Sequence, residues 1–325
     1  MARSHRADSA LLTTGQKTSA IELWRFAFVY TPPLASRNTL LGTELMKTNP
    51  ISRRNWMLTA SSLAAAASLS SRSFAATGHP FKLGIQLYSL RGYDADTALQ
   101  HAKELGFEQV EFYTGMFPLD STSEQIAEMK KKVADLGLTI SSHGVNKLSA
   151  DAAKNRKVFE FAKAIGIPTI TADPDPDSFD NLDELVKEFD IRVAIHNHGP
   201  RHRYNKVIDV LDAIEGHDER IGACADLGHY IRSGQGATEV IRLLKGRLYG
   251  IHLKDFAEMQ DKSKGVILGK GHLDVEGVFL ALRTVGFPEN GAISLEYEEH
   301  PDNPLEDIRQ CVAVAKAAMA KVAGT

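Results

Sequence analysis

Short β-rich runs alternate with amphipathic helical stretches along this chain, and this alternation constrains its fold more than any other feature. Eight strand candidates follow one another in residues 76–325. They are Lys82–Leu87, Gln109–Phe112, Thr139–His143, Thr169–Ala172, Arg192–His196, Ile221–Ala225, Leu248–Leu253 and Ala292–Tyr297. Most are continuous apolar runs, as expected of parallel strands that are covered on both faces. Eight such pairs in about 250 residues predict an α/β fold closed into a (β/α)8 barrel rather than an open sheet.

Helical periodicity and glycines complete this repeat. Clear helical stretches include Ala95–Leu105, Ser123–Leu136, Ala152–Ile165 and Leu305–Val322. In the second of these, apolar side chains recur every three or four residues, which predicts one buried stripe. The stripe consists of Ile126, Met129, Val133 and Leu136. A left-handed C-cap needs no side chain, and glycine follows several helices. These glycines are Gly106, Gly137, Gly166, Gly246 and Gly286. No GxGxxG motif follows the first strand, so a dinucleotide-binding fold is not expected.

Ionisable side chains stand at the ends of the last four predicted strands. They are His196, Asp226, His252 and Glu296. The carboxyl ends of barrel strands converge, so we expect two imidazoles and two carboxylates to surround one divalent ion. This donor set suits Mn²⁺ first, with Zn²⁺, Co²⁺, Fe²⁺ or Mg²⁺ as alternatives, and no paired cysteines point to a thiolate site.

Each of these residues also has a simpler interpretation. A single histidine at a strand end more often packs or caps, and an aspartate before glycine commonly makes a turn. Burying all four together without an ion would be costly, which favours the metal site.

The residues resemble the sugar phosphate isomerase/epimerase family, whose members have a xylose isomerase-like TIM barrel. The resemblance covers residues 80–322 and is carried by the segments 83–91, 225–229, 252–255, 268–274 and 294–297. In relatives that act on free sugars, it implies a Glu, Asp, His, Glu metal set whose two glutamates move the proton. Here the fifth-strand position is His196, which removes one carboxylate base. His198 is an alternative ligand, because residues two apart on a strand share a face.

Several residues are candidates for the base that takes a proton from the substrate. Glu296 could be ligand and base together. His143 at the end of the third predicted strand and Glu111 on the second are further candidates. Their simpler interpretations are a strand cap for His143 and an outward-facing or salt-bridged strand residue for Glu111.

Other residues are expected to contact substrate. His198 and His229 are predicted to bind it, and His229 could instead orient the Asp226 carboxylate. Lys254 shares the face of His252 and could bind an oxyanion or carbonyl, or assist catalysis; the alternative is a salt bridge to Asp255 or another strand-end acid. The stretch Gly269–Gly271 is interpreted as a loop that closes over substrate.

The function that these residues predict first is metal-dependent isomerisation or epimerisation of a sugar, by proton abstraction next to a carbonyl through an enediolate. The alternative is a lyase or hydratase acting on a 3-keto-glycoside, in which the same enediolate expels a glycosidic oxygen by β-elimination. The substrate is thus expected to be a small sugar or keto-glycoside. The sequence is also compatible with a homo-oligomer.

Two other classes of function fit less well. Phosphodiester hydrolysis, as in the apurinic endonucleases that resemble the same barrel, requires a multi-zinc cluster and a basic face. The 38 basic and 41 acidic residues give a net charge of -3, so we expect no nucleic-acid partner. The remaining class is a non-catalytic sugar-binding barrel.

Residues 46–75 resemble a twin-arginine export signal. Arg53 and Arg54 precede a run of small and apolar residues, Thr59–Leu69, and Ser73–Ala75 is an acceptable cleavage signal. The run is too short to span a bilayer, so no stable membrane anchor is expected. We predict export by the twin-arginine translocase and a periplasmic or secreted protein, with residues 1–45 as an over-long extension and 76–325 as the barrel. An amphipathic first helix with a chance arginine pair is the alternative.

Overall fold

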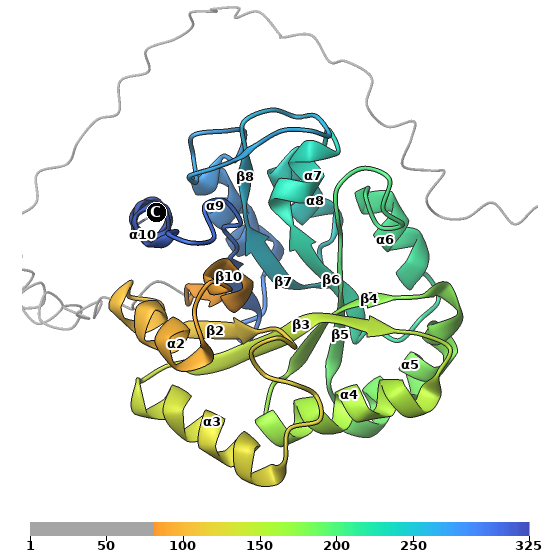
Figure 1. The fold of residues 1–325 in the computed structure, drawn as a ribbon. Helices are drawn as coiled ribbons and strands as arrows, with labels where there is room; N and C mark the ends of the chain where they lie inside the picture. Colours follow the sequence, from red (N-terminus) through yellow and green to blue (C-terminus); the bar gives the residue numbers. More distant parts are fainter. Residues whose placement is uncertain (1–80, 325) are drawn as a thin grey trace, which may run out of the picture. The chain divides into compact units, whose positions relative to one another are not determined.

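Eight parallel strands close into a barrel in this computed structural model, which describes residues 81–324 (Figure 1). In chain order the barrel strands are β1 (Gly84–Gln86), β2 (Gln109–Phe112), β3 (Thr139–Leu148), β4 (Thr169–Pro174), β5 (Arg192–His196), β6 (Ile221–Asp226), β7 (Leu248–Leu253) and β10 (Ala292–Leu295). Each strand pairs with its neighbour along the chain, and β10 closes the ring against β1. The predicted (β/α)8 barrel is confirmed.

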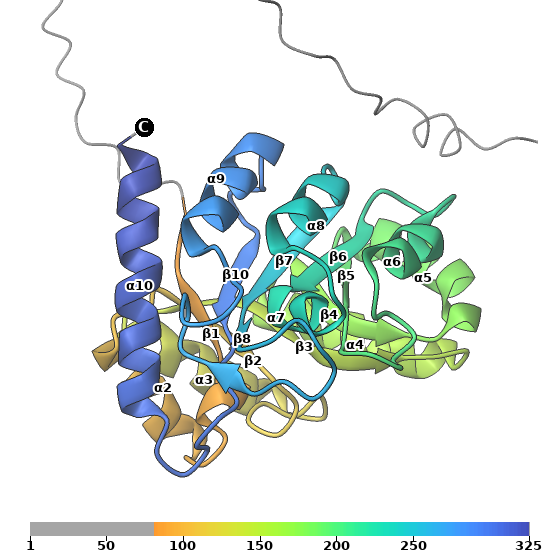
Figure 2. The same ribbon diagram turned by 90° about the horizontal axis from the view of Figure 1, so that it is seen from above.

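Helices surround the barrel and cover the outer faces of the strands, as Figures 1 and 2 show. They are α2 (Ala95–Glu104), α3 (Ser123–Asp135), α4 (Ala152–Ile165), α5 (Phe179–Phe189), α6 (Val207–Ile214), α7 (Leu227–Arg232), α8 (Ala237–Leu243), α9 (Val275–Val285) and α10 (Leu305–Ala323), with the short 3-10 helices η2 (Leu87–Leu90) and η3 (Pro176–Ser178). Several begin with a side-chain cap; Asp94, for example, accepts from the backbone of Thr97 at the start of α2. All five glycines predicted at helix ends have positive φ, between 67° and 83°.

Five strand ends differ from the predictions: β4 continues to Pro174 and β6 to Asp226, and three further differences bear more on the site. β1 ends at Gln86, because Leu87 begins the 3-10 helix η2. β3 continues to Leu148, so His143 lies inside this strand and not at its end. β10 ends at Leu295, and Glu296 lies in the segment that follows. An apolar run marks where a strand is buried, whereas backbone pairing with a neighbour decides where it stops.

Two helical predictions also need correction. After β7 the chain forms an antiparallel pair, β8 (Asp255–Phe256) and β9 (Gly265–Val266), before it reaches α9. The predicted stripe of α3 is only partly buried: Val133 is fully covered, and its three companions pack against the rim of the core. The four predicted residues thus form the side of the helix that faces the core, although only one of them is completely covered.

Polar side chains occupy part of the barrel interior. Glu111, Ser142, Thr171 and Ser294 are each at most 1% exposed. Burying polar groups at this depth is costly unless they are hydrogen-bonded. These four side chains are hydrogen-bonded to one another.

No helix within residues 81–324 combines the length and the apolar character needed to cross a membrane. The predicted extension and export signal, residues 1–75, lie outside the described residues.

We expect Gly222→Ala to destabilise the barrel more than Gly246→Ala. At Gly246, φ is +83° and an added Cβ meets nothing within 4 Å, so the cost is that of a left-handed backbone, about 1–2 kcal/mol. At Gly222 in β6, an added Cβ would lie 2.2 Å from the carbonyl oxygen of Arg247, and the cost is roughly 3 kcal/mol because the chain must move apart. Urea unfolding followed by circular dichroism measures both, and equal losses would contradict the close packing of β6 on β7.

Candidate metal centre

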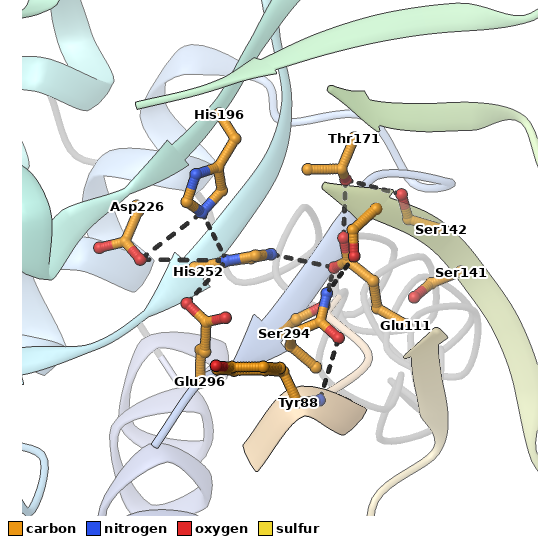
Figure 3. Close-up of polar contacts among 12 residues, drawn as sticks. Tyr88, Glu111, Ser141, Ser142, Thr171, His196, Asp226, His252, Ser294 and Glu296 are labelled. Atoms are coloured by element: carbon orange, nitrogen blue, oxygen red, sulfur yellow. Dashed lines mark hydrogen bonds and ion pairs between the residues drawn. The ribbon is translucent and has the colours of Figure 1, made fainter. Parts of the chain in front are cut away.

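Four side chains converge where β5, β6, β7 and β10 end (Figure 3). They are His196, Asp226, His252 and Glu296, all buried, and the four ligand atoms they offer lie within 4.8 Å of one another. The structure thus brings together the four residues that were predicted to meet. That they bind an ion stays a prediction.

The contacts among these side chains leave four donor atoms facing one small space. Nε2 of His196 lies 3.0 Å from Nδ1 of His252 and 3.7 Å from Oδ2 of Asp226. Nδ1 of His252 lies 3.3 Å from Oε2 of Glu296 and 3.9 Å from Oδ2 of Asp226. Two imidazole nitrogens and two carboxylate oxygens therefore point at the same position.

Asp226 divides its two oxygens between the fold and the cluster. It is the last residue of β6, in register with His252 of β7, and α7 begins directly after it. Oδ1 accepts a hydrogen bond from the backbone N–H of His229 at 2.7 Å and so caps α7. Oδ2 is buried without a hydrogen-bond partner and faces the cluster. The turn-forming and the ligand interpretations of this aspartate are compatible, because each uses a different oxygen.

Asn197 holds the ends of β5 and β6 together. Its Oδ1 accepts from the backbone N–H of Asp226 at 2.8 Å, and its Nδ2 donates to the carbonyl of Asp226 at 3.0 Å. Sequence reasoning missed this residue. The available signal was its place between two candidate site residues, His196 and His198.

Lys254 provides the positive charge beside the cluster. Its buried Nζ lies 2.6 Å from Oε2 of Glu296 and 3.2 Å from both Oδ2 of Asp226 and Oε1 of Glu298. Lys254 does not form the salt bridge to Asp255 that was considered as an alternative. It pairs with other acids at the strand ends, which the same alternative allowed.

Asp255 instead anchors the glycine-containing loop. Its Oδ2 accepts from the backbone N–H groups of Gly269 and Gly271 at 2.9 and 3.0 Å, and its Oδ1 accepts from Leu273 at 2.9 Å. A loop tied down by three hydrogen bonds to one buried carboxylate does not match the prediction that Gly269–Gly271 closes over substrate.

Burial and nearby charge act against each other at Glu296 and Lys254. Burial alone would raise the pKa of Glu296, but Lys254 and His252 outweigh it and hold this pKa well below its usual range. Burial opposes the charge on Lys254, yet Asp226, Glu296 and Glu298 raise its pKa above the usual range. At neutral pH the pair is therefore a carboxylate and an ammonium.

The two imidazoles of the cluster respond differently. Burial, followed by the charge of His252, holds the pKa of His196 well below 6.5. Burial also opposes charge on His252, but Cys224, Glu111 and Glu296 raise its pKa well above 6.5. His196 is thus ready to offer a lone pair, whereas His252 has to lose a proton before it can do so.

The buried charges fit one divalent cation. Around the cluster the carboxylates of Glu111, Asp226 and Glu296 are buried, and so is Lys254. A fourth buried carboxylate, Asp255, is occupied by backbone N–H groups of the loop that follows β9. In the metal-free protein a protonated His252 supplies one further positive charge. Once an ion has displaced that proton, three negative charges face the single charge of Lys254, and a divalent cation balances the remaining two. The Oδ2 of Asp226 accepts no hydrogen bond and has only the ion pair with Lys254, so it can also serve as a ligand. The nitrogen and oxygen donors suit Mn²⁺, Fe²⁺, Co²⁺ or Zn²⁺.

A cavity of about 330 Å³ opens beside the cluster, with His196 and Glu296 in its wall. The other side chains that line it are Gln86, Tyr88, Tyr113, Thr114, Val145, His198, His229 and Glu298, together with Gly144. The predicted substrate contacts of His198 and His229 thus have a cavity to act in. The two tyrosines and Gln86 were not singled out from the sequence, although Gln86 ends the first strand and Tyr88 lies two residues after it in η2.

His198 lies next to the cluster and not in it. β5 ends at His196, so His198 belongs to the following loop and does not share a strand face with it. Its ring centre lies 4.7 Å from that of His196 and 5.7 Å from that of His229. The reason given for His198 as an alternative ligand is therefore wrong, and the structure brings His196 to the cluster.

His143 and Glu111 do not line the cavity. The Nε2 of His143 bonds the carbonyl of Phe117 at 2.9 Å, and its Nδ1 contacts Asn146 at 3.2 Å, so both ring nitrogens are engaged in the fold. Glu111 points into the barrel and not outward, and its Oε2 lies 3.1 Å from Nε2 of His252. The salt-bridged interpretation of Glu111 is the one that the structure shows.

The sequence and the fold of this chain are similar to those of known proteins. A family model described as xylose isomerase-like TIM barrel matches residues 99–318. Inosose dehydratase of Clostridium perfringens is 26% identical over 152 residues, which are 40% of this chain and about half (49%) of that relative.

Solved structures share the whole barrel. An uncharacterised protein from Parabacteroides distasonis is 27% identical with a TM-score of 0.58, and the match covers 73% of this chain and 99% of that one. The 3-keto-D-glucoside 4-epimerase of E. coli is 17% identical with a TM-score of 0.59 over 73% and 99% of the two chains, which shows likeness of fold.

We expect Asp226→Asn to lose bound divalent metal while it keeps the α7 cap, because an asparagine oxygen can still accept from His229 but carries no charge. Asp226→Ala should lose both, with about 1 kcal/mol of stability for the cap. Elemental analysis of protein purified without chelators, together with urea unfolding, separates the two effects. Undiminished metal in both variants would contradict the ligand assignment.

Metal affinity should rise with pH above 6.5. The raised pKa of His252 means that its proton stabilises the metal-free fold below the ordinary value of 6.5, and that this stabilisation is lost as pH climbs through the raised value. An ion must displace that proton, so binding strengthens over the same range. Calorimetric titration in buffers of different ionisation enthalpy should detect about one proton released per ion; affinity independent of pH would refute this.

Proposed function

This chain belongs to the xylose isomerase-like TIM barrel family, and we propose that it is a metal-dependent enzyme that enolises an uncharged sugar next to its carbonyl group and returns an isomer or epimer. The observation that carries the proposal is the double position of Glu296, which belongs to the four-residue cluster and also lines the cavity. In this proposal the base and the candidate metal site therefore face the same cavity.

Glu296 is the base in this proposal. Its contacts with Lys254 and His252 are both made through Oε2, which leaves Oε1 as the oxygen that takes the proton from carbon. Since Lys254 keeps the pKa of Glu296 low, this carboxylate is always ionised but is a weak base. The barrier therefore has to be lowered mainly by stabilising the enediolate.

A divalent ion held by His196, Asp226, His252 and Glu296 would supply Lewis-acid stabilisation of negative charge on the substrate oxygens. The chain adds its own groups to this effect. The imidazoles of His198 and His229 line the cavity beside Glu296 and can orient the hydroxyl groups of a sugar. Burial, then Lys254, holds the pKa of His229 well below 6.5, so this ring is a neutral hydrogen-bonding partner.

The cavity favours a neutral carbohydrate over a sugar phosphate. Among the described residues that line it, none is lysine or arginine, and two are glutamates. Arg91 stacks on Tyr88 with its guanidinium 4.5 Å from the ring centre, but it donates to the carbonyls of Tyr88 and Glu298 at 2.9 and 2.6 Å. A phosphate group would meet two carboxylates whose cationic partner, Lys254, is already engaged with both, whereas the tyrosine rings can pack on the apolar face of a sugar ring.

A second candidate, β-elimination from a 3-keto-glycoside, is favoured by the positions of the carboxylates. Glu296 and Glu298 are the cavity-lining carboxylates among the described residues, and both follow β10. Inversion at carbon needs a second group on the opposite face, whereas isomerisation or elimination needs one base. The dehydratase and epimerase named above support keeping both outcomes as candidates for this chain.

The decisive experiment is deuterium exchange in D2O. Metal-loaded protein is incubated with neutral ketoses, with ketose phosphates and with a 3-keto-glycoside, and each is followed by proton NMR. We expect deuterium at the carbon next to the carbonyl of a neutral substrate, and a drop of about 10²- to 10⁴-fold in Glu296→Gln. The metal content of this variant is measured alongside, because Glu296 is also a candidate ligand.

The products separate the outcomes. A new sugar isomer identifies the isomerase or epimerase, and a released aglycone identifies the lyase. Exchange with ketose phosphates alone would refute the neutral substrate. Absence of exchange with every carbonyl sugar, at full metal occupancy, would overturn the proposed function and favour a sugar-binding barrel.

We further propose export of the protein by the twin-arginine route, on the strength of Arg53, Arg54 and the run Thr59–Leu69. N-terminal sequencing of protein from the exporting cell tests this, and a retained segment 46–75 would refute it.

A further inference from the structure

We propose that Glu111 is a positioning residue that holds His252 with Nδ1 toward the cluster and thereby sets the affinity for the metal. This inference rests on the proposed function only in that it takes the cluster to bind a divalent ion. It assigns to Glu111 a role other than proton transfer to or from substrate.

The location of Glu111 excludes contact with substrate. It lies on β2, across the barrel from the strands that carry the cluster, and its side chain is fully buried. It is absent from the lining of the cavity, where Glu296 is present. Glu111 therefore does not reach a proton on a substrate carbon in that cavity. It does reach His252.

Glu111 is fixed from three other strands. Its Oε1 accepts from the hydroxyl of Thr171 on β4 at 2.7 Å. Its Oε2 accepts from the hydroxyl of Ser294 on β10 at 2.6 Å and contacts Nε2 of His252 on β7 at 3.1 Å. Ser142 of β3 supports Thr171 through a contact of 2.8 Å between the two hydroxyls. Figure 3 shows this network on the side of His252 away from the other cluster residues.

The network decides which nitrogen of His252 is free. An ionised carboxylate only accepts hydrogen bonds, so the ring nitrogen that faces Glu111 has to carry a proton. With the proton on Nε2, a neutral His252 presents the lone pair of Nδ1 to His196, Asp226 and Glu296. A hydrogen-bonded carboxylate behind a ligand histidine also raises its basicity and fixes the ring plane.

The alternative is that Glu111 is a polar core residue with no effect on the ion. Two features speak against this. A buried carboxylate needs hydrogen-bond donors, and one of the donors that Glu111 contacts is the ring nitrogen of His252, a member of the cluster. The hydroxyl donors also come from separate strands, so the carboxylate is held at one distance from the ring.

The test compares metal affinity in Glu111→Gln and Glu111→Asp with the wild type. Glutamine keeps the length but removes the charge and one acceptor, whereas aspartate keeps the charge but loses the reach to His252. We expect both to bind Zn²⁺ and Mn²⁺ about 10- to 100-fold more weakly in chelator competition. Thr171→Val is the matched control, because it removes one hydrogen bond to Glu111 and leaves the contact with His252; a much smaller loss is expected.

A second measurement uses the wild-type protein and so does not require that any variant folds. In the Zn²⁺-loaded wild type, ¹⁵N NMR of the histidine rings should show His252 protonated on Nε2, with that proton protected from exchange. A proton on Nδ1, or unchanged affinity in folded Glu111 variants, would overturn the positioning role. If Asp226→Ala also kept full affinity, the metal site itself would be wrong, and this outcome differs from failure of Glu111 alone.

Discussion

The structure of this barrel depends on how three buried carboxylates are compensated at one end of it. Glu111, Asp226 and Glu296 approach one another inside a protein interior, where like charges repel and water is excluded. Lys254 lies between two of them, and the third faces an imidazole. A divalent ion that displaces the proton of His252 would balance the remaining negative charge, so the compensation of these carboxylates and the candidate metal site depend on each other.

Parallel strand register brings these groups together. Asp226 is paired with His252, whereas His196 is paired with Cys224, two residues before Asp226. Residues two apart on a strand share a face, so the three side chains still point to the same side of the barrel wall. The helix that begins after β6 then takes one oxygen of Asp226 for its cap and leaves the other for the cluster. The turn from β6 into α7 therefore also orients a candidate ligand. The short segment Ala225–His229 both caps the helix and presents an oxygen to the cluster.

His196 distinguishes this site from the two-glutamate arrangement that the family resemblance implies. An imidazole there has a low pKa because it is buried beside His252, so it can offer a lone pair but not a negative charge. The remaining carboxylates that line the cavity come from one strand end. Chemistry that needs a single base is therefore better supported by this site than chemistry that needs two opposed carboxylates.

The residue pattern alone determined the barrel, the helix-ending glycines and the four strand ends that meet, because hydrophobic periodicity and strand-end position are local properties that a closed barrel converts into proximity. Only the tertiary structure decided the roles of the others. His143 is engaged with Phe117, Lys254 pairs with Glu296 and not Asp255, and Glu111 faces inward to His252. Each of these contacts joins residues distant in sequence, and the choice among partners depends on strand pairing, burial and side-chain direction across the barrel, which no local pattern contains.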